Sequence, residues 1–130
     1  MNEKFDILKC NICGQIIQIL EPNLGDLVCC NEPMELLRAN LEEKDKLLAE
    51  KHIPLIEENG DKKYITLKNH PMSNEHYIQL IEAYTKDKKE LHIKFLEPNE
   101  VAEFDISYLN NDIEMQELCN IHGLWRNTND

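Results

Sequence analysis

Residues 53–67 read IPLIEENGDKKYITL, and this stretch decides the fold class. Two short runs suited to β-strands flank Asn59-Gly60, a dipeptide that strongly favours a turn between antiparallel strands. We therefore expect a β-hairpin with strands at residues 53–57 and 63–67. Such a hairpin favours an all-β domain over a fold in which helices connect parallel strands.

Further strands are predicted downstream of this hairpin. They are expected at residues 77–84, 91–96, 101–108 and 112–118. Short strands at this spacing are typical of an antiparallel β-sandwich rather than of a βαβ unit. Upstream, residues 38–50 are charged and contain neither glycine nor proline, which predicts a connector with one or two helical turns.

The composition excludes several classes of protein. The 130 residues are 42% hydrophobic and 30% charged, as in globular proteins. No apolar run approaches the roughly 18 residues that span a bilayer, and no secretory signal is evident, so we expect a cytoplasmic protein with no membrane partner. The net charge of −11 argues against nucleic acid as a partner. Five cysteines in a reducing compartment indicate metal ligands, redox chemistry or buried thiols rather than disulfides.

Four cysteines lie within the first 30 residues, at Cys10, Cys13, Cys29 and Cys30. The first two form a C-x-x-C knuckle, which turns back so that both thiolates reach one ion. The second two are adjacent, and because neighbouring residues of an extended strand point to opposite faces, this pair requires a bent backbone. So short a segment buries too little surface to fold without a metal. Four thiolates fit iron and zinc about equally, and the site alone indicates no chemistry.

The remaining cysteine lies three residues before one histidine, two more histidines share a predicted loop, and a fourth precedes a predicted strand; these are positions where a sandwich displays functional groups. The candidate residues are His52, His70, His76, Cys119 and His122. Taken singly, each histidine is more often structural, and Cys119 could be a buried thiol or the nucleophile of a Cys–His pair. A shared site of sulfur and imidazole would suit iron, copper or zinc. His92 falls inside a predicted strand and is interpreted as a structural or surface residue.

Several segments together resemble the desulfoferrodoxins, which are two-iron superoxide reductases. The matching segments are residues 10–14 (CNICG), 29–34 (CCNEPM), 50–54 (EKHIP), 70–72 (HPM), 75–78 (EHYI) and 119–123 (CNIHG). Any one of them is a weak signal, whereas their combination in this order is specific and extends over nearly the whole chain.

The resemblance implies a fold and a domain organisation. Residues 1–38 would form a desulforedoxin-like domain that holds an Fe(Cys)4 centre through Cys10, Cys13, Cys29 and Cys30, with zinc as the alternative metal. Residues 39–50 would be a connector. Residues 51–130 would form an immunoglobulin-like antiparallel β-sandwich that holds a second, catalytic iron.

The resemblance also implies an activity, the one-electron reduction of superoxide to hydrogen peroxide without release of oxygen. The catalytic iron would have four imidazole ligands and an axial thiolate, from His52, His70, His76, His122 and Cys119. Lys51 would attract the anionic substrate, and Glu50 would occupy the sixth position once iron is oxidised. A small rubredoxin-like electron donor and a homodimer are also implied. The alternatives are an electron-transfer or iron-binding protein with a silent second site, and a zinc-stabilised interaction module.

Overall fold

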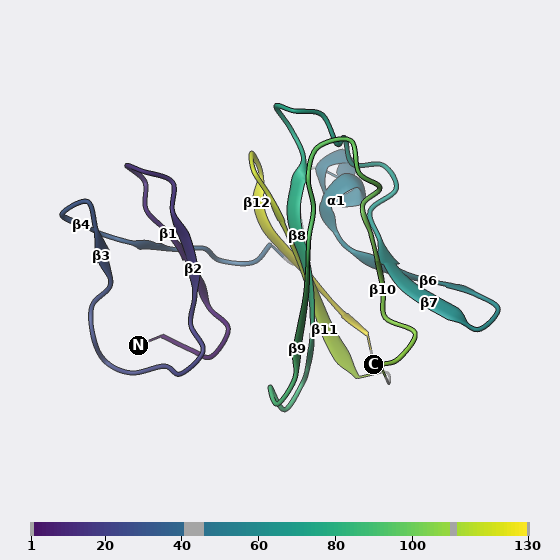
Figure 1. The fold of residues 1–130 in the computed structure, drawn as a ribbon, viewed down its shortest axis with the longest axis horizontal. Coiled ribbons are helices and arrows are strands. Elements are labelled where there is room, and N and C mark those ends of the chain that lie inside the picture. Colours follow the sequence, from purple (N-terminus) through teal and green to yellow (C-terminus); the bar gives the residue numbers. More distant parts are fainter. Residues whose placement is uncertain (1, 41–45, 110–111, 130) are drawn as a thin grey trace. The chain divides into compact units, whose positions relative to one another are not determined.

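The computed structural model describes residues 2–40, 46–109 and 112–129. The chain divides into two compact units, Met1–Arg38 and Ala39–Asp130. Both consist mainly of antiparallel strands, which confirms the predicted all-β class (Figure 1). Among the described residues, no helix has the length and apolar character needed to cross a membrane.

The first unit contains five very short strands. They are β1 Ile7–Lys9, β2 Ile16–Gln18, β3 Val28–Cys29, β4 Glu32–Pro33 and β5 Glu35–Leu36. A three-stranded sheet has the order β2-β1-β5, and β3 and β4 form a separate hairpin. The buried apolar side chains of this unit are few, with Phe5, Ile7 and Leu8 the main ones. A core this small gives little stability of its own, as the sequence predicts.

The second unit is a sandwich of two antiparallel sheets with one helix. Its elements are α1 Lys46–His52, β6 Leu55–Asn59, β7 Lys62–Thr66, β8 Ile78–Thr85, β9 Leu91–Phe95, β10 Glu103–Asp105, β11 Ile113–Cys119 and β12 Gly123–Asn129. One sheet has the order β10-β7-β6 and the other the order β12-β11-β8-β9 (Figure 1). This arrangement confirms the predicted β-sandwich.

The predicted hairpin is present as β6 and β7. Asn59 pairs with Lys62, which leaves Gly60 and Asp61 as a two-residue loop. Gly60 has a φ of +64°, and glycine at the first loop position is typical of a type II′ turn. The hairpin begins later than predicted because the N–H of Ile53 still donates to a helical carbonyl, that of Ala49, at 2.9 Å.

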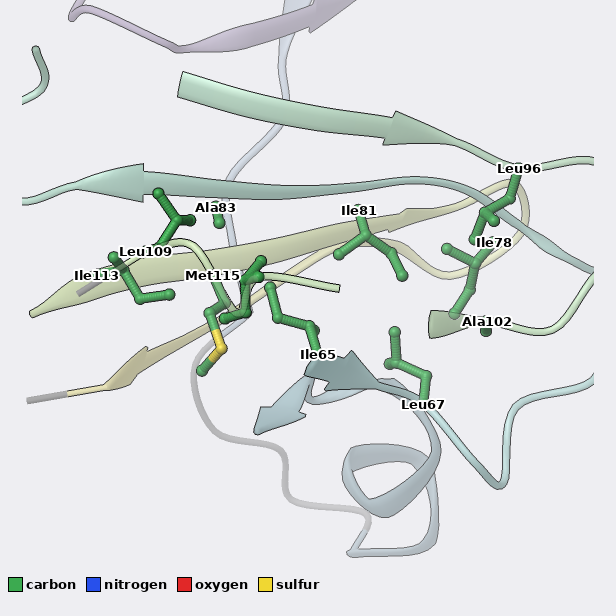
Figure 2. Close-up of a cluster of buried hydrophobic side chains, with 11 residues drawn as sticks. Ile65, Leu67, Ile78, Ile81, Ala83, Leu96, Ala102, Leu109, Ile113 and Met115 are labelled. Carbon is green, nitrogen blue, oxygen red and sulfur yellow. The ribbon is translucent and has the colours of Figure 1, made fainter. Parts of the chain in front are cut away.

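An apolar core fills the space between the two sheets (Figure 2). Ile81 and Ala83 of β8 and Met115 of β11 come from one sheet, and Ile65 of β7 faces them from the other; all four are at most 1% exposed. Side chains alternate between the two faces of a strand, so one face of each strand builds this core. This packed core holds the strands in place, and the loops at their ends are attached to a rigid framework.

Two strands differ from the predictions. β12 has no counterpart among the predicted strands, although it pairs with β11 along its full length, from Ile113↔Asn129 to Cys119↔Gly123. β10 covers only part of the predicted 101–108 strand, because Asp105 accepts hydrogen bonds from Ser107 in a turn. Part of the predicted connector, residues 41–45, lies outside the described residues.

Candidate metal centres

The four N-terminal cysteines come together in the first unit. Their sulfur atoms all lie within 4.8 Å of one another. Cys13 Sγ is 3.6 Å from Cys29 Sγ, which in turn is 4.0 Å from Cys30 Sγ. Four thiolates arranged tetrahedrally at about 2.3 Å from an ion are about 3.8 Å apart. The cluster therefore fits a tetrahedral Fe or Zn site.

The backbone explains how two adjacent cysteines reach one point. Cys30 and Asn31 have φ values of 55° and 64° and form the two-residue loop between β3 and β4. Two consecutive positive φ angles are typical of a type I′ turn. The turn brings the sulfur atoms of Cys29 and Cys30 to the same side of the chain. This is the bent backbone that the sequence predicts for two adjacent ligands. In the knuckle, the N–H of Gly14, at φ +84°, donates to the Cys10 carbonyl at 3.0 Å.

The thiols of this cluster differ in acidity. The pKa of Cys10 is lowered to about 6, chiefly because the backbone N–H groups of Cys13 and Ile12 stabilise its thiolate. The pKa of Cys29 is raised to about 12, mainly by side-chain hydrogen bonds with Cys13 and Cys10. Those same two neighbours raise the pKa of Cys30. A metal ion that binds here would therefore displace protons from Cys29 and Cys30, and Cys10 would supply the first thiolate.

The second cluster lies in the sandwich unit, where four imidazole rings form a closed circle. The ring centroids of neighbours are 4.6 to 5.0 Å apart in the order His52, His70, His76, His122 and back to His52. His52 and His76, which face each other across the circle, are 6.1 Å apart. The elements that meet here are the last turn of α1, the loop before β8, and the turn between β11 and β12.

Two ring nitrogens of this circle lack the partners that buried polar atoms usually have. His76 Nε2 and His122 Nδ1 are buried without a hydrogen-bond partner among the described residues. His70 Nδ1 lies 2.6 Å from the Pro71 carbonyl oxygen, which can only accept, so His70 Nε2 carries the free lone pair. His70 Nε2 is 3.1 Å from His52 Nε2. Two nitrogens at right angles on an ion, with bonds of about 2.1 Å, would be about 3.0 Å apart.

Burial favours the neutral form of two of these rings, His70 and His76, and a histidine must be neutral to bind a metal. The pKa of His70 is lowered to about 4, mainly by burial. The pKa of His76 is lowered by burial first, and then by the charges of His122 and Lys51. The orphaned nitrogens and the neutral rings together fit a bound cation.

Cys119 completes the cluster. Its sulfur lies within 4.8 Å of ligand atoms of His52, His76 and His122, and the residue is 2% exposed. Burial raises the pKa of the Cys119 thiol, and the N–H groups of His122 and Ile121 act in the opposite direction. The His122 N–H lies 3.4 Å from the sulfur. A thiolate bound to a metal would keep this backbone support.

Two residues that hold the site together are not among the predicted site residues. Asn120 joins the two ligand loops, because its Oδ1 accepts from Tyr77 N–H at 2.9 Å and its Nδ2 donates to the Glu75 carbonyl at 3.0 Å. Trp125 contacts two of the histidines. Asn120 lies inside the quoted CNIHG motif and Trp125 two residues after it, so their proximity to the ligands was a usable signal.

The other predicted residues are placed as follows. Lys51 is exposed and precedes His52 in the chain, and its charge contributes to the lowered pKa of His76. Glu50 is exposed and is not among the clustered ligand residues; it lines a hollow of about 210 Å³ together with Ile56. His92 lies apart, 3.2 Å from Glu90 Oε1.

Family models match both parts of the chain that contain these clusters. The family model for the desulfoferrodoxin N-terminal domain matches residues 2–37, and the model for desulfoferrodoxin matches residues 43–128. The chain belongs to the desulfoferrodoxin family. A desulfoferrodoxin homolog from Methanothermobacter thermautotrophicus is 41% identical over 96% of this chain and 99% of its own length. The first unit resembles desulforedoxin from Megalodesulfovibrio gigas, at 47% identity over 34 residues, 26% of this chain and 92% of that protein.

A solved structure shares the desulfoferrodoxin fold. The crystal structure of the superoxide reductase from Treponema pallidum matches with a TM-score of 0.68 and 23% identity, covering 98% of this chain and 100% of that one. This match supports the fold found here, with its small N-terminal unit and its β-sandwich. As a desulfoferrodoxin, the chain has one cluster of the kind expected for each of two iron centres.

Proposed function

We propose that this desulfoferrodoxin is a superoxide reductase, which reduces superoxide to hydrogen peroxide and releases no oxygen. One observation carries the proposal: a circle of four imidazole rings with a buried thiol beside it. Five such ligands leave one position of an octahedral ion open, and an open position is what a catalytic metal needs. A purely structural site closes all positions with protein ligands.

The ligand set gives the site its electronic character. We assign His52, His70, His76 and His122 as the imidazole ligands and Cys119 as the thiolate. When bound, iron supplies the single electron that superoxide takes up. The Cys119 thiolate would donate electron density to the bound metal, as in thiolate-ligated haem, and the N–H groups of His122 and Ile121 would moderate this donation. Imidazole ligands add no charge, so with a single thiolate the iron-loaded site would keep a net positive charge, which favours an anionic substrate.

Lys51 attracts the substrate. The protein carries a net charge of −11, so an anion approaching it meets a repulsive field over most of the surface. The positive charge of the exposed Lys51 side chain contributes to the lowered pKa of His76. It therefore provides a local positive charge where superoxide must enter. Glu50, one residue earlier on α1, is assigned to the sixth position after oxidation, which requires its exposed side chain to move toward the rings.

The overall reaction consumes one superoxide, one electron and two protons, and yields one hydrogen peroxide. A reductant must return the electron, and we assign this role to a small rubredoxin-like protein. We propose that residues 1–38 hold a first iron, that 39–50 connect, that 51–130 hold the catalytic iron, and that two copies form a homodimer. The five free cysteines support a cytoplasmic location, where thiols stay reduced.

The experiment that tests the proposal combines metal analysis with a superoxide assay. Purified protein should contain about two irons per chain and consume superoxide when given a reductant. Cys119→Ser, which keeps the size of the side chain but removes the thiolate, should lose this activity. Cys30→Ser in the first cluster is the matched control and should keep it. Equal activity in Cys119→Ser and wild type would contradict the assigned thiolate, and an iron-loaded wild type that consumes no superoxide would favour an electron-transfer protein with a silent second site.

A further inference from the structure

Trp125 contacts two of the four imidazole-bearing residues at once. Its ring stacks on His52, with centroids 4.8 Å apart and an angle of 26° between the planes. Its Nε1–H donates to the carbonyl oxygen of His122 at 3.0 Å. The face of the indole thus packs on the His52 ring, and the indole N–H binds the backbone of His122. Trp125 is only 1% exposed, so these contacts are not shared with water.

His52 and His122 both come from elements with little support of their own. His52 is the last residue of α1, a helix of seven residues. His122 lies in the turn between β11 and β12, just before Gly123, which has a φ of +83°. The backbone of a helix or a turn does not fix the direction of an imidazole ring, because the side chain can adopt several rotamers. The orientation of these rings therefore depends on what packs against them.

Trp125 itself is held firmly. It lies in the middle of β12 and pairs with Glu117 of β11. On the other edge of β12, Asn40 pairs alongside Trp125: its N–H donates to the Leu124 carbonyl at 2.9 Å, and its carbonyl accepts from Arg126 N–H at 3.0 Å. The backbone of β12 is thus hydrogen-bonded on both sides of the tryptophan.

We propose that Trp125 is a positioning residue for the second metal centre, which fixes the plane of His52 and the backbone of His122 together. This inference rests on the proposed metal site. Groups that orient metal ligands commonly change metal affinity about 10- to 100-fold when they are removed. Here one side chain orients two neighbouring ligands, so its loss should change both the affinity and the electronic properties of the bound iron.

The test uses two substitutions in the full-length protein loaded with iron. Trp125→Phe keeps an aromatic face for His52 but removes the N–H that holds His122, and we expect about a tenfold loss of iron affinity at the second site. Trp125→Leu removes both contacts, and we expect about a hundredfold loss. Affinity is measured by competition with a chelator. The reduction potential and the thiolate-to-iron absorption band of the iron that remains at the second site should also differ from those of the wild type. The difference should be larger in Trp125→Leu than in Trp125→Phe.

The control separates positioning from general destabilisation. Ile65→Ala opens the sandwich core at a residue that is fully buried, so it lowers stability by another route. It should leave the potential and the band unchanged. Tryptophan variants with wild-type affinity and potential would overturn the inference while leaving the proposed function intact. A wild-type protein with no iron at this site would overturn both.

The fluorescence of the protein offers a second measurement, because Trp125 is its single tryptophan. Ferrous iron bound by a ring in contact with the indole should quench its emission strongly. The quenching should persist in Cys13→Ser, which disables the first cluster, and disappear in His52→Ala. Emission that is unaffected by iron loading in Cys13→Ser would contradict the stacking on which the inference depends.

Discussion

The depressed pKa of His70 predicts how the sandwich unit responds to acid. The folded protein holds His70 neutral, with a pKa of about 4, whereas an unfolded chain has an ordinary histidine pKa of about 6.5. Below pH 6.5 the unfolded state therefore binds a proton that the folded state does not. Stability is fully present above pH 6.5 and is lost as the pH falls toward 4.

The size of the effect follows from the two pKa values. For a single group, the free energy of unfolding of the metal-free protein should fall by about 2 kcal/mol between pH 8 and pH 5, and by about 3 kcal/mol by pH 4. His70 is 6% exposed, so solvent screens little of this effect. The lowered pKa of His76 acts in the same direction. The total loss in the wild type should therefore exceed the contribution of His70 alone.

The assay is denaturant unfolding at pH 8 and pH 5, followed by Trp125 emission, because this residue lies in the sandwich unit. His70→Gln removes the titrating ring, while its amide can still donate to the Pro71 carbonyl. The wild type should lose about 2 kcal/mol more than His70→Gln over this pH range, and the effect of His76 cancels in the comparison. Equal losses in the two proteins would refute the reasoning.

Three further predictions concern single residues. Gly123→Ala should cost about 1 kcal/mol of unfolding free energy, measured by thermal or denaturant unfolding, because a Cβ there meets open space but the φ of +83° disfavours other residues; no loss would refute the backbone argument. Lys51→Ala should slow superoxide capture about tenfold and flatten its salt dependence in pulse radiolysis, whereas Lys51→Arg should not; an unchanged salt response would contradict steering. Cys13→Ser should lose the first metal, measured by elemental analysis, yet keep superoxide turnover, since the second cluster's residues all lie beyond residue 50; loss of turnover would show that the first site is required.

Much of the fold could be predicted from local sequence signals. Asn59-Gly60 marked the first hairpin of the sandwich, and the adjacent Cys29 and Cys30 required the sharp turn that the structure contains. These features depend on backbone preferences of a few neighbouring residues. β12 could not be predicted in the same way, because its sequence is polar and its strand conformation depends on pairing with β11.

The site residues could be proposed from the sequence as a set, but their arrangement could not be predicted. Spacing alone left the histidines ambiguous, and the family resemblance was needed to group them. The order of the rings, with His52 opposite His76, depends on how a helix end, a loop and a turn meet in space. The role of Trp125 depends on the same arrangement of elements. It contacts His52, which is 73 positions earlier in the chain, and His122, which is three positions earlier.

The most direct test of the central claim is the ratio of hydrogen peroxide formed to superoxide consumed, measured with excess reductant while dissolved oxygen is monitored. A reductase forms one peroxide for each superoxide and no oxygen. Dismutation forms one peroxide for every two superoxides, together with one oxygen. We predict a ratio of one, with no oxygen released and with the activity lost in Cys119→Ser. A ratio of one half with oxygen release, or full activity without the Cys119 thiolate, would contradict the account.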